Sequence, residues 1–567
     1  MNNKLVFADY LVFIIYFLVV AGYGYWIYQR KKKKVADTHD FFLAEGSLTW
    51  WAIGASLIAS NISAEQFIGM SGNGFFVGIA VSAYEWIAAL ALVIVAVWFM
   101  PVYLKNKIFT MPQFLKMRYN ETVGLIMTIF WLFLYVFVNI TSIMYLGALA
   151  INNLSGGQHL HLIMICLAVF AIFITLGGMK VIGYTDVIQV LVLIIGGLAT
   201  TYMALTMVSE QFGLGRNVLA GFNQLIKDAP DHFHMILSKP DAHTPQGEID
   251  KYLILPGIAM YFAGQWIVNL NYWGCNQYIT QRALGAKNLT TARTGILFAA
   301  LLKLMMPIIV MLPGIAAYVL YKNGGLQTEM TLGGKFNQDN AYSSVLGFLP
   351  NGFKGLSVAA LTAAIVASLA GKANSISTIF TLDIYKKYIN KEAGEKQMVW
   401  IGRIVILAAM IFSVAFTWND LLGISREGGF TYIQRYTGYI SPGIFAMFLL
   451  GMFWKRTTGA AAIAGLVTGF VIVVIFSSYA PQWFGHETWF YTAFLNDKGD
   501  YEIPFLITMG WSFFFTVLIM VVISLAGPKV NPKAFVLDKG MFKLQPSSIF
   551  LIVVILLLLM GLYVRFW

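Results

Sequence analysis

The chain is poor in charge and in cysteine. Only 11% of its 567 residues are Asp, Glu, Lys or Arg, whereas about 25% of the residues of a soluble protein are charged. The sequence therefore excludes an ordinary soluble protein. The two cysteines, Cys166 and Cys275, both lie inside apolar stretches, so there is no disulfide framework and no cysteine-based metal site.

The chain also lacks a soluble segment of domain size. The longest stretch between apolar runs, about residues 208–252, is shorter than a normal domain. This argues against a membrane sensor with an attached signalling domain. Neither paired carboxylates nor a cluster of metal ligands share one membrane depth, which argues against a membrane enzyme.

What the chain has in abundance is apolar residues, at 59%, with a mean hydropathy of +0.72. A run of about 20 apolar residues can cross a bilayer as a helix, and about fourteen such runs are present. They cover about 8–28, 50–73, 78–103, 122–152, 161–177, 184–207, 253–281, 294–321, 355–384, 399–419, 429–454, 457–478, 503–526 and 548–566. The first is too long for a signal peptide, and its basic cluster follows it. The predicted fold class is an all-α polytopic membrane protein.

The basic residues predict the orientation of these helices. They gather in alternate loops, beginning with Arg30 to Lys34, whereas the opposite loop 153–160 has none and 479–502 has only Lys498. Cytoplasmic loops are enriched in Lys and Arg. We therefore expect a multi-pass protein of the inner (plasma) membrane with both termini outside, and the net charge of +12 does not indicate nucleic acid.

The run 50–73 is interrupted by polar residues at its centre. Asn61, Ser63, Glu65 and Gln66 lie within six residues, and each costs free energy in hydrocarbon unless it finds a partner. Membrane proteins accept this cost where a helix is broken and lines a cavity. A polar contact between helices is the alternative, but so many polar groups favour a binding site.

A second interrupted run, 253–281, follows five spans later. It contains Asn269, Asn271, Asn276 and Gln277. Two broken helices at matching places in two halves indicate a secondary transporter, and an odd number of spans per repeat makes the second repeat inverted. We predict a single transporter domain over 1–567. Its parts are an extra helix at 8–28, inverted repeats at 50–207 and 253–454, and three additional helices at 457–567.

Glu85, Lys303 and Asp186 are ionisable residues within apolar runs, and each should face a cavity with a partner. Glu85 and Lys303 could pair with each other, either in a binding cavity or as a buried ion pair that fixes packing. Asp186 lies near a basic loop, where an interfacial ion pair and a role in ion exit are equally compatible with the sequence.

Oxygen ligands for a cation are suggested by Ala364 and Ser368. Residues four apart share a helical face, and hard cations such as Na⁺ favour carbonyl and hydroxyl oxygens. The break after Ala59 would free its carbonyl and that of Ile62. The alternative is a small-residue packing face. The segment 430–438 is polar and aromatic, which suits either a hydroxyl-rich ligand or an interfacial aromatic belt.

Several segments resemble the solute:sodium symporter family nearly residue for residue. They are 50–59 with 61–72, Tyr84-Glu85-Trp86, Thr185 to Gln189, Tyr272-Trp273-Gly274, Leu312 to Tyr318 and Ser441-Pro442-Gly443. The resemblance implies a fold of the leucine-transporter type with inverted five-helix repeats and broken helices 1 and 6. It implies a transporter, not an enzyme, that moves a sugar (a hexose such as galactose or glucose) with Na⁺ by alternating access. Another small solute, such as sialic acid, an amino acid or a vitamin, is the alternative.

The resemblance also implies roles for individual residues. Substrate-binding residues would be Asn61, Gln66, Glu85, Asn269, Lys303, Gln434, Tyr272, Trp273 and Tyr135. Gate residues would be Met70, Tyr84, Phe430 and Tyr272. Na⁺ would be bound by the carbonyls of Ala59, Ile62 and Ala364 and by the hydroxyl of Ser368, with Asp186 on its exit path. Since the run 355–384 offers one hydroxyl ligand, that of Ser368, we expect one Na⁺ per sugar.

Three positions depart from the pattern of a galactose-transporting member of the family. Ala88 replaces a sugar-contacting serine and Asn271 replaces a tyrosine beside the gate, which leaves the identity of the sugar open. Ala367 replaces a serine that also reaches sodium, which bears on the strength of Na⁺ binding.

Overall fold

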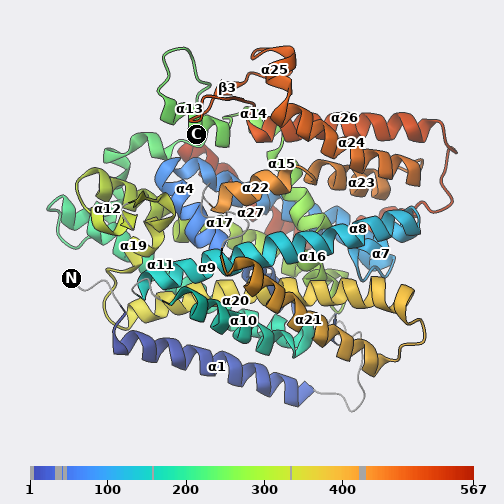
Figure 1. The fold of residues 1–567 in the computed structure, drawn as a ribbon, viewed down its shortest axis with the longest axis horizontal. Helices are drawn as coiled ribbons and strands as arrows, with labels where there is room; N and C mark the ends of the chain where they lie inside the picture. The colour runs from blue at the N-terminus through green and yellow to red at the C-terminus, as the bar shows by residue number, and fades with distance from the viewer. Residues whose placement is uncertain (1–4, 32–40, 43–47, 156–158, 333–334, 420–428) are drawn as a thin grey trace. The chain divides into compact units, whose positions relative to one another are not determined.

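The computed structural model describes residues 5–31, 41–42, 48–155, 159–332, 335–419 and 429–567 (Figure 1). These residues are mostly helical, with two short antiparallel hairpins. One joins β1 (Thr331–Leu332) to β2 (Lys335–Phe336), and the other joins β3 (Phe494–Leu495) to β4 (Tyr501–Glu502). Of the predicted basic cluster, Lys32 to Lys34 lie outside the described residues.

Among the described residues, ten helices are long and apolar enough to cross a membrane. They are Phe7–Arg30, Ile79–Lys105, Glu121–Asn152, Gly178–Gln211, Leu289–Lys322, Phe353–Ile389, Glu395–Thr417, Gly459–Ser478, Phe505–Leu525 and Pro546–Phe566. An eleventh span results if Gln246–Phe262 and Gln265–Cys275, which meet at 83°, are counted as one. This confirms a multi-pass helical protein, although not the count of fourteen.

The remaining predicted runs are built from shorter pieces. The run 161–177 corresponds to α10 (Leu160–Thr175), and the run 429–454 is divided between α22 (Gly429–Gly438) and α23 (Ser441–Phe453). The run 50–73 is divided among α3 (Trp50–Asn61), the π-helix η2 (Glu65–Met70) and α4 (Ser71–Phe76). In the runs 50–73 and 429–454, polar and glycine residues interrupt the regular hydrogen-bond ladder, so no single long helix forms.

The chain folds as two compact units, called here unit 1 and unit 2. Unit 1 comprises residues 1–79, 128–233 and 281–430, and unit 2 comprises residues 80–127, 234–280 and 431–567. Each unit is assembled from three separate stretches of the chain. Helices that pack against each other within a unit therefore often lie far apart in the sequence.

Unit 1 is organised around α20 (Phe353–Ile379), which packs against α1 (Phe7–Lys31), α3, α10, α11 (Gly178–Gln211) and α21 (Glu395–Thr417). Figure 1 shows α1, α10 and α20 running side by side. The close approach of α11 to α20 depends on Gly196, where an added Cβ would lie 2.6 Å from the Cβ of Ala360. Small residues at such crossings let membrane helices pack by van der Waals contact.

Unit 2 contains a bundle of α23, α24 (Gly459–Ser478) and α26 (Phe505–Leu525), and a pair formed by α5 (Ala83–Ile94) and α15 (Gln265–Leu270). The buried Arg118 donates to the carbonyl oxygens of Gly451, Trp454 and Thr457 at distances of 2.6–3.0 Å. A cation is favourable at the carbonyls of Gly451 and Trp454 because they lie at the negative, C-terminal end of the α23 helix dipole. This contact fixes the loop that follows α23.

Candidate functional site

The predicted interruption of the run 50–73 is present. The helix α3 ends at Asn61, Ile62 is extended with φ −78° and ψ 112°, and helical structure resumes at Glu65. The side-chain oxygen of Gln66 accepts hydrogen bonds from both the backbone N–H and the hydroxyl of Ser63, each at 3.0 Å. In an unbroken helix the Ser63 N–H would bond the Ala59 carbonyl. Gln66 therefore captures the donor that Ala59 would otherwise use.

Four oxygen atoms converge beside this break. The Ser368 hydroxyl of α20 lies 3.0 Å from the carbonyl oxygen of Ser60 and 3.4 Å from those of Ala59 and Ile62. A hydroxyl has a single hydrogen to donate, so it can satisfy only one carbonyl at a time. The cluster is buried, with Ser368 and Ser60 0% exposed. Buried oxygens that face one another without enough donors form a favourable environment for a hard cation.

The structure brings together three of the four predicted Na⁺ ligands, Ala59, Ile62 and Ser368. The fourth, Ala364, is buried one turn before Ser368 on the same helix. Sequence reasoning missed Ser60, whose carbonyl is the nearest of the three to the hydroxyl. Nothing in its side chain marks it, because its contribution is a backbone oxygen exposed by the break.

Lys303, Asn61 and Tyr135 are the other predicted substrate residues in unit 1. Lys303 lies on α17 (Leu289–Lys322), which runs along the broken helix. An added Cβ on Gly295 would meet Ile53, and one on Gly314 would meet the Ser71 carbonyl. Lys303 lies between these two crossings and hence at the level of the break. Its side chain is 1% exposed, that of Asn61 7% and that of Tyr135 0%.

Asp186 lies on α11, and its carboxylate accepts a hydrogen bond of 2.5 Å from the hydroxyl of Ser56. Ser56 is on α3, one turn before Ala59, so this carboxylate lies close to the oxygen cluster along the helix. Asp186 also interacts electrostatically with Arg282. Sequence reasoning did not find Ser56, since the pairing depends on how α3 and α11 face each other.

Unit 2 holds the remaining substrate residues. Glu85 and Asn269 are buried on the packed pair α5 and α15, and the Asn269 amide donates to the Gln265 carbonyl at 2.9 Å. Gln434 is half-buried on α22. Glu85 and Lys303 belong to different units, so their pairing stays a prediction. At one departure from the family pattern, Asn271 donates to the Ser441 hydroxyl at 3.1 Å.

The predicted gate residues are all aromatic or apolar. In unit 1, Met70 ends η2 and Phe430 packs tightly on the preceding Gly69, where an added Cβ would lie 2.6 Å from that of Phe430. In unit 2, Tyr84 is buried on α5, and Tyr272 and Trp273 contact each other edge to face, with ring centroids 5.2 Å apart. The Tyr272 hydroxyl accepts a hydrogen bond from Tyr278, a partner that sequence reasoning missed.

The ring of Tyr272 is expected to contribute more than its hydroxyl. Because stacking is worth about 0.5–1.5 kcal/mol beyond buried area, Tyr272→Ala should weaken sugar binding by roughly two- to tenfold more than Tyr272→Phe. Binding of sugar to the purified variants measures this. Tyr278→Phe is the control, because it removes the hydroxyl that donates to Tyr272 and leaves the Tyr272 ring in place. Equal losses in Tyr272→Ala and Tyr272→Phe would show that the hydroxyl is the important group.

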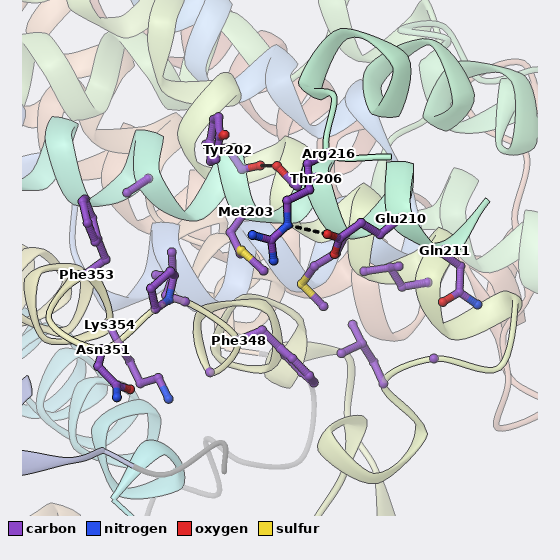
Figure 2. Close-up of a pocket in the computed structure, with 18 of the residues that line it drawn as sticks. Tyr202, Met203, Thr206, Glu210, Gln211, Arg216, Phe348, Asn351, Phe353 and Lys354 are labelled. Carbon is purple, nitrogen blue, oxygen red and sulfur yellow. Dashed lines mark hydrogen bonds and ion pairs between the residues drawn. The ribbon is translucent and has the colours of Figure 1, made fainter. Parts of the chain in front are cut away.

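A separate cavity of about 1110 Å³ lies at the ends of α11 and α17, beside residues 347–354 (Figure 2). Met203 and Phe348 contribute apolar surface, and Glu210 pairs with Arg216 at 2.5 Å. None of the predicted substrate or Na⁺ residues lines it. The cavity is therefore distinct from the oxygen cluster.

The long apolar helices and the break after Asn61 define a class of protein, a multi-pass membrane protein with a broken helix beside a buried cluster of oxygen atoms. The model of the sodium:solute symporter family matches residues 41–469, and the chain belongs to this family. It is similar over its full length to the sodium/glucose cotransporter of Vibrio parahaemolyticus, at 42% identity over 576 residues, with 99% of that protein covered.

More distant relatives extend to mammals. Human sodium/myo-inositol cotransporter 2 is 33% identical over 483 residues, with 82% of this chain and 69% of that protein covered. Sheep sodium/glucose cotransporter 1 is 33% identical, with 82% of this chain and 71% of that protein covered. Among solved structures, a substrate-bound outward-open Na⁺-coupled sialic acid symporter superposes with a TM-score of 0.74 at 20% identity, covering 93% of this chain and 99% of that one. This likeness shows the fold.

Proposed function

We propose that this protein is a sodium-coupled sugar symporter that moves a neutral hexose, such as glucose or galactose, together with Na⁺ by alternating access. The oxygen cluster of Ser368 with the carbonyls of Ala59, Ser60 and Ile62 carries the proposal, since a hydroxyl surrounded by three carbonyls suits a desolvated cation. The 42% identity to a sodium/glucose cotransporter over the full length supports sugar as the solute.

The proposal includes the finer architecture expected from the sequence. We propose fourteen spans, of which 50–207 and 253–454 form two inverted repeats of the leucine-transporter type. We also propose an inner-membrane location with both termini outside. The broken helices at Ile62 and Asn276, where the backbone becomes extended, support this arrangement, because broken helices at matching positions are typical of such repeats.

The substrate site in this proposal contains the polar residues predicted from the sequence. The residues that would contribute hydrogen bonds to the sugar are Asn61, Gln66, Glu85, Asn269, Lys303 and Gln434. Tyr135, Tyr272 and Trp273 would pack on the sugar, and Met70, Tyr84 and Phe430 would close over it. Asp186 would lie on the path by which Na⁺ leaves towards the cytoplasm, a role that its hydrogen bond to Ser56 near the cluster supports.

Transport should be electrogenic, because the sugar is neutral and Na⁺ carries one charge inward. A charge that crosses about 100 mV gains roughly 2.3 kcal/mol, which corresponds to nearly fifty-fold accumulation at about 1.4 kcal/mol per decade. The experiment is uptake of a panel of sugars into proteoliposomes, with Na⁺ or choline outside and an imposed inside-negative potential. Uptake that ignores both the Na⁺ gradient and the potential would remove the proposal.

The same panel should include sialic acid, an amino acid and a vitamin. The solved symporter with this fold carries sialic acid, a sugar with a carboxylate that would need a facing cation such as Lys303. Preference for a carboxylated solute would retain the sodium coupling and change the substrate class.

A further inference from the structure

A buried lysine lies one helical turn beyond the proposed sodium ligand. Lys372 follows Ser368 by four residues on α20 and is 3% exposed. Residues four apart share a helical face, and four residues advance the helix by about 6 Å. Lys372 therefore lies about one helical turn from the place where Na⁺ would bind.

A partly buried carboxylate, that of Glu65, comes from the segment that follows the break. Glu65 is the first residue of η2, three residues after Ile62, and one of its carboxylate oxygens is buried without a hydrogen-bond partner. The carboxylate of Glu65 interacts electrostatically with the ammonium group of Lys372. The two charges thus come from the same two elements that build the oxygen cluster, α20 and the segment after the break.

Two further charged side chains near the cluster, Asp186 and Arg282, interact with each other. Asp186 accepts the hydrogen bond from Ser56 and interacts electrostatically with Arg282. The Arg282 guanidinium packs against Gly371, where an added Cβ would lie 2.2 Å from one of its nitrogens. Glu65 and Lys372 form a second pair of acidic and basic residues beside the cluster.

A charged lysine inside the membrane is costly, so Lys372 is expected to have a partner of opposite charge. A carboxylate close to carbonyl oxygens is the ligand set that a hard cation prefers. Without Lys372, Glu65 would leave a net negative charge beside the oxygen cluster. That charge would strengthen Na⁺ binding and could hold an additional cation.

We propose that Lys372 limits this transporter to one Na⁺ per sugar by neutralising Glu65, and that it sets the Na⁺ affinity of the cluster. The proposal rests on the function proposed above and adds a residue that determines ion stoichiometry. Substitutions of Lys372 and of Glu65 should change the Na⁺ affinity in opposite directions. Residues that act only through packing would not produce this result.

The test compares Lys372→Met, Glu65→Gln and the double variant with wild type. Two quantities are measured: Na⁺ binding to the purified protein without sugar, and the ratio of Na⁺ to sugar taken up by proteoliposomes. Lys372→Met should bind Na⁺ on the order of tenfold more tightly and move more than one Na⁺ per sugar. Glu65→Gln should bind Na⁺ on the order of tenfold more weakly, and the double variant should return close to wild type.

Lys354→Met is the matched control, since Lys354 is also buried on α20 but lies at its opposite end. It should leave Na⁺ affinity and the ion-to-sugar ratio unchanged. If Lys372→Met fails to fold, the double variant, which keeps the charge balanced, still reports whether neutrality at this position restores wild-type Na⁺ binding. Shifts of Lys372→Met and Glu65→Gln in the same direction, or an unchanged affinity and ratio in both, would overturn the proposal. Wild-type protein without Na⁺-dependent sugar uptake would instead refute the proposed function.

Discussion

Replacing Ser368 with alanine is expected to raise the Na⁺ concentration for half-maximal uptake by about 10- to 100-fold. A hydrogen-bonding partner of a charged group is worth about 1.5–3 kcal/mol, and about 1.4 kcal/mol is tenfold. The hydroxyl is the only side-chain oxygen of the cluster, which otherwise consists of backbone carbonyls. With alanine at position 367, the neighbouring residue supplies no second hydroxyl.

The same substitution should weaken sugar binding only when Na⁺ is present. Coupling between two ligands is reciprocal, and it typically amounts to about 1–3 kcal/mol. Calorimetry of sugar binding in Na⁺ and in choline buffer measures it, and Ser368→Ala should resemble wild type in choline because no proposed sugar contact is removed. If Na⁺ strengthens sugar binding as much in the variant as in wild type, the ion binds elsewhere.

The control for this experiment is Ser357→Ala on the same helix. Ser357 is 0% exposed and donates to the Gly196 carbonyl of α11 at 3.0 Å, so its removal also deletes one buried hydroxyl from α20. Its effect should be a loss of stability without a change in Na⁺ dependence. A similar shift in both variants would mean that Ser368 acts through packing of α20.

Replacing Gln66 with alanine is expected to weaken the binding of both ligands. The amide oxygen of Gln66 accepts hydrogen bonds from the Ser63 N–H and from the Ser63 hydroxyl, each at 3.0 Å. A buried N–H that loses its acceptor costs about 1–3 kcal/mol. The Ser63 N–H would then return to the Ala59 carbonyl and withdraw it from the cluster. Na⁺ binding without sugar should weaken by on the order of tenfold, and sugar binding should fall as well.

Gln66→Glu separates the two roles of this side chain. A carboxylate can still accept from Ser63, so the break and the oxygen cluster should persist, while the amide donor proposed for the sugar is lost. We expect Na⁺ binding to survive in Gln66→Glu and sugar binding to be lost. Unchanged Na⁺ affinity in Gln66→Ala would show that the break does not depend on this amide.

The long helices and the position of the first break follow from the sequence because both are local properties. A run of about 20 apolar residues has to become a helix in a membrane, and the polar group from Asn61 to Gln66 cannot continue such a helix cheaply. The helical period also places Ala364 and Ser368 on one face. The same reasoning predicts open carbonyls after Ala59, which the structure confirms.

Other features depend on which residues meet across long distances in the chain, and only the tertiary structure decides them. The hydrogen bond of Ser56 to Asp186 joins residues 130 positions apart, and that of Ser368 to the Ser60 carbonyl joins residues 308 apart. The interaction of Glu65 with Lys372 likewise requires the broken helix to lie against α20. Sequence periodicity defines the faces of a helix but not the partner of each face, because that choice is made by the shapes of all helices packed together.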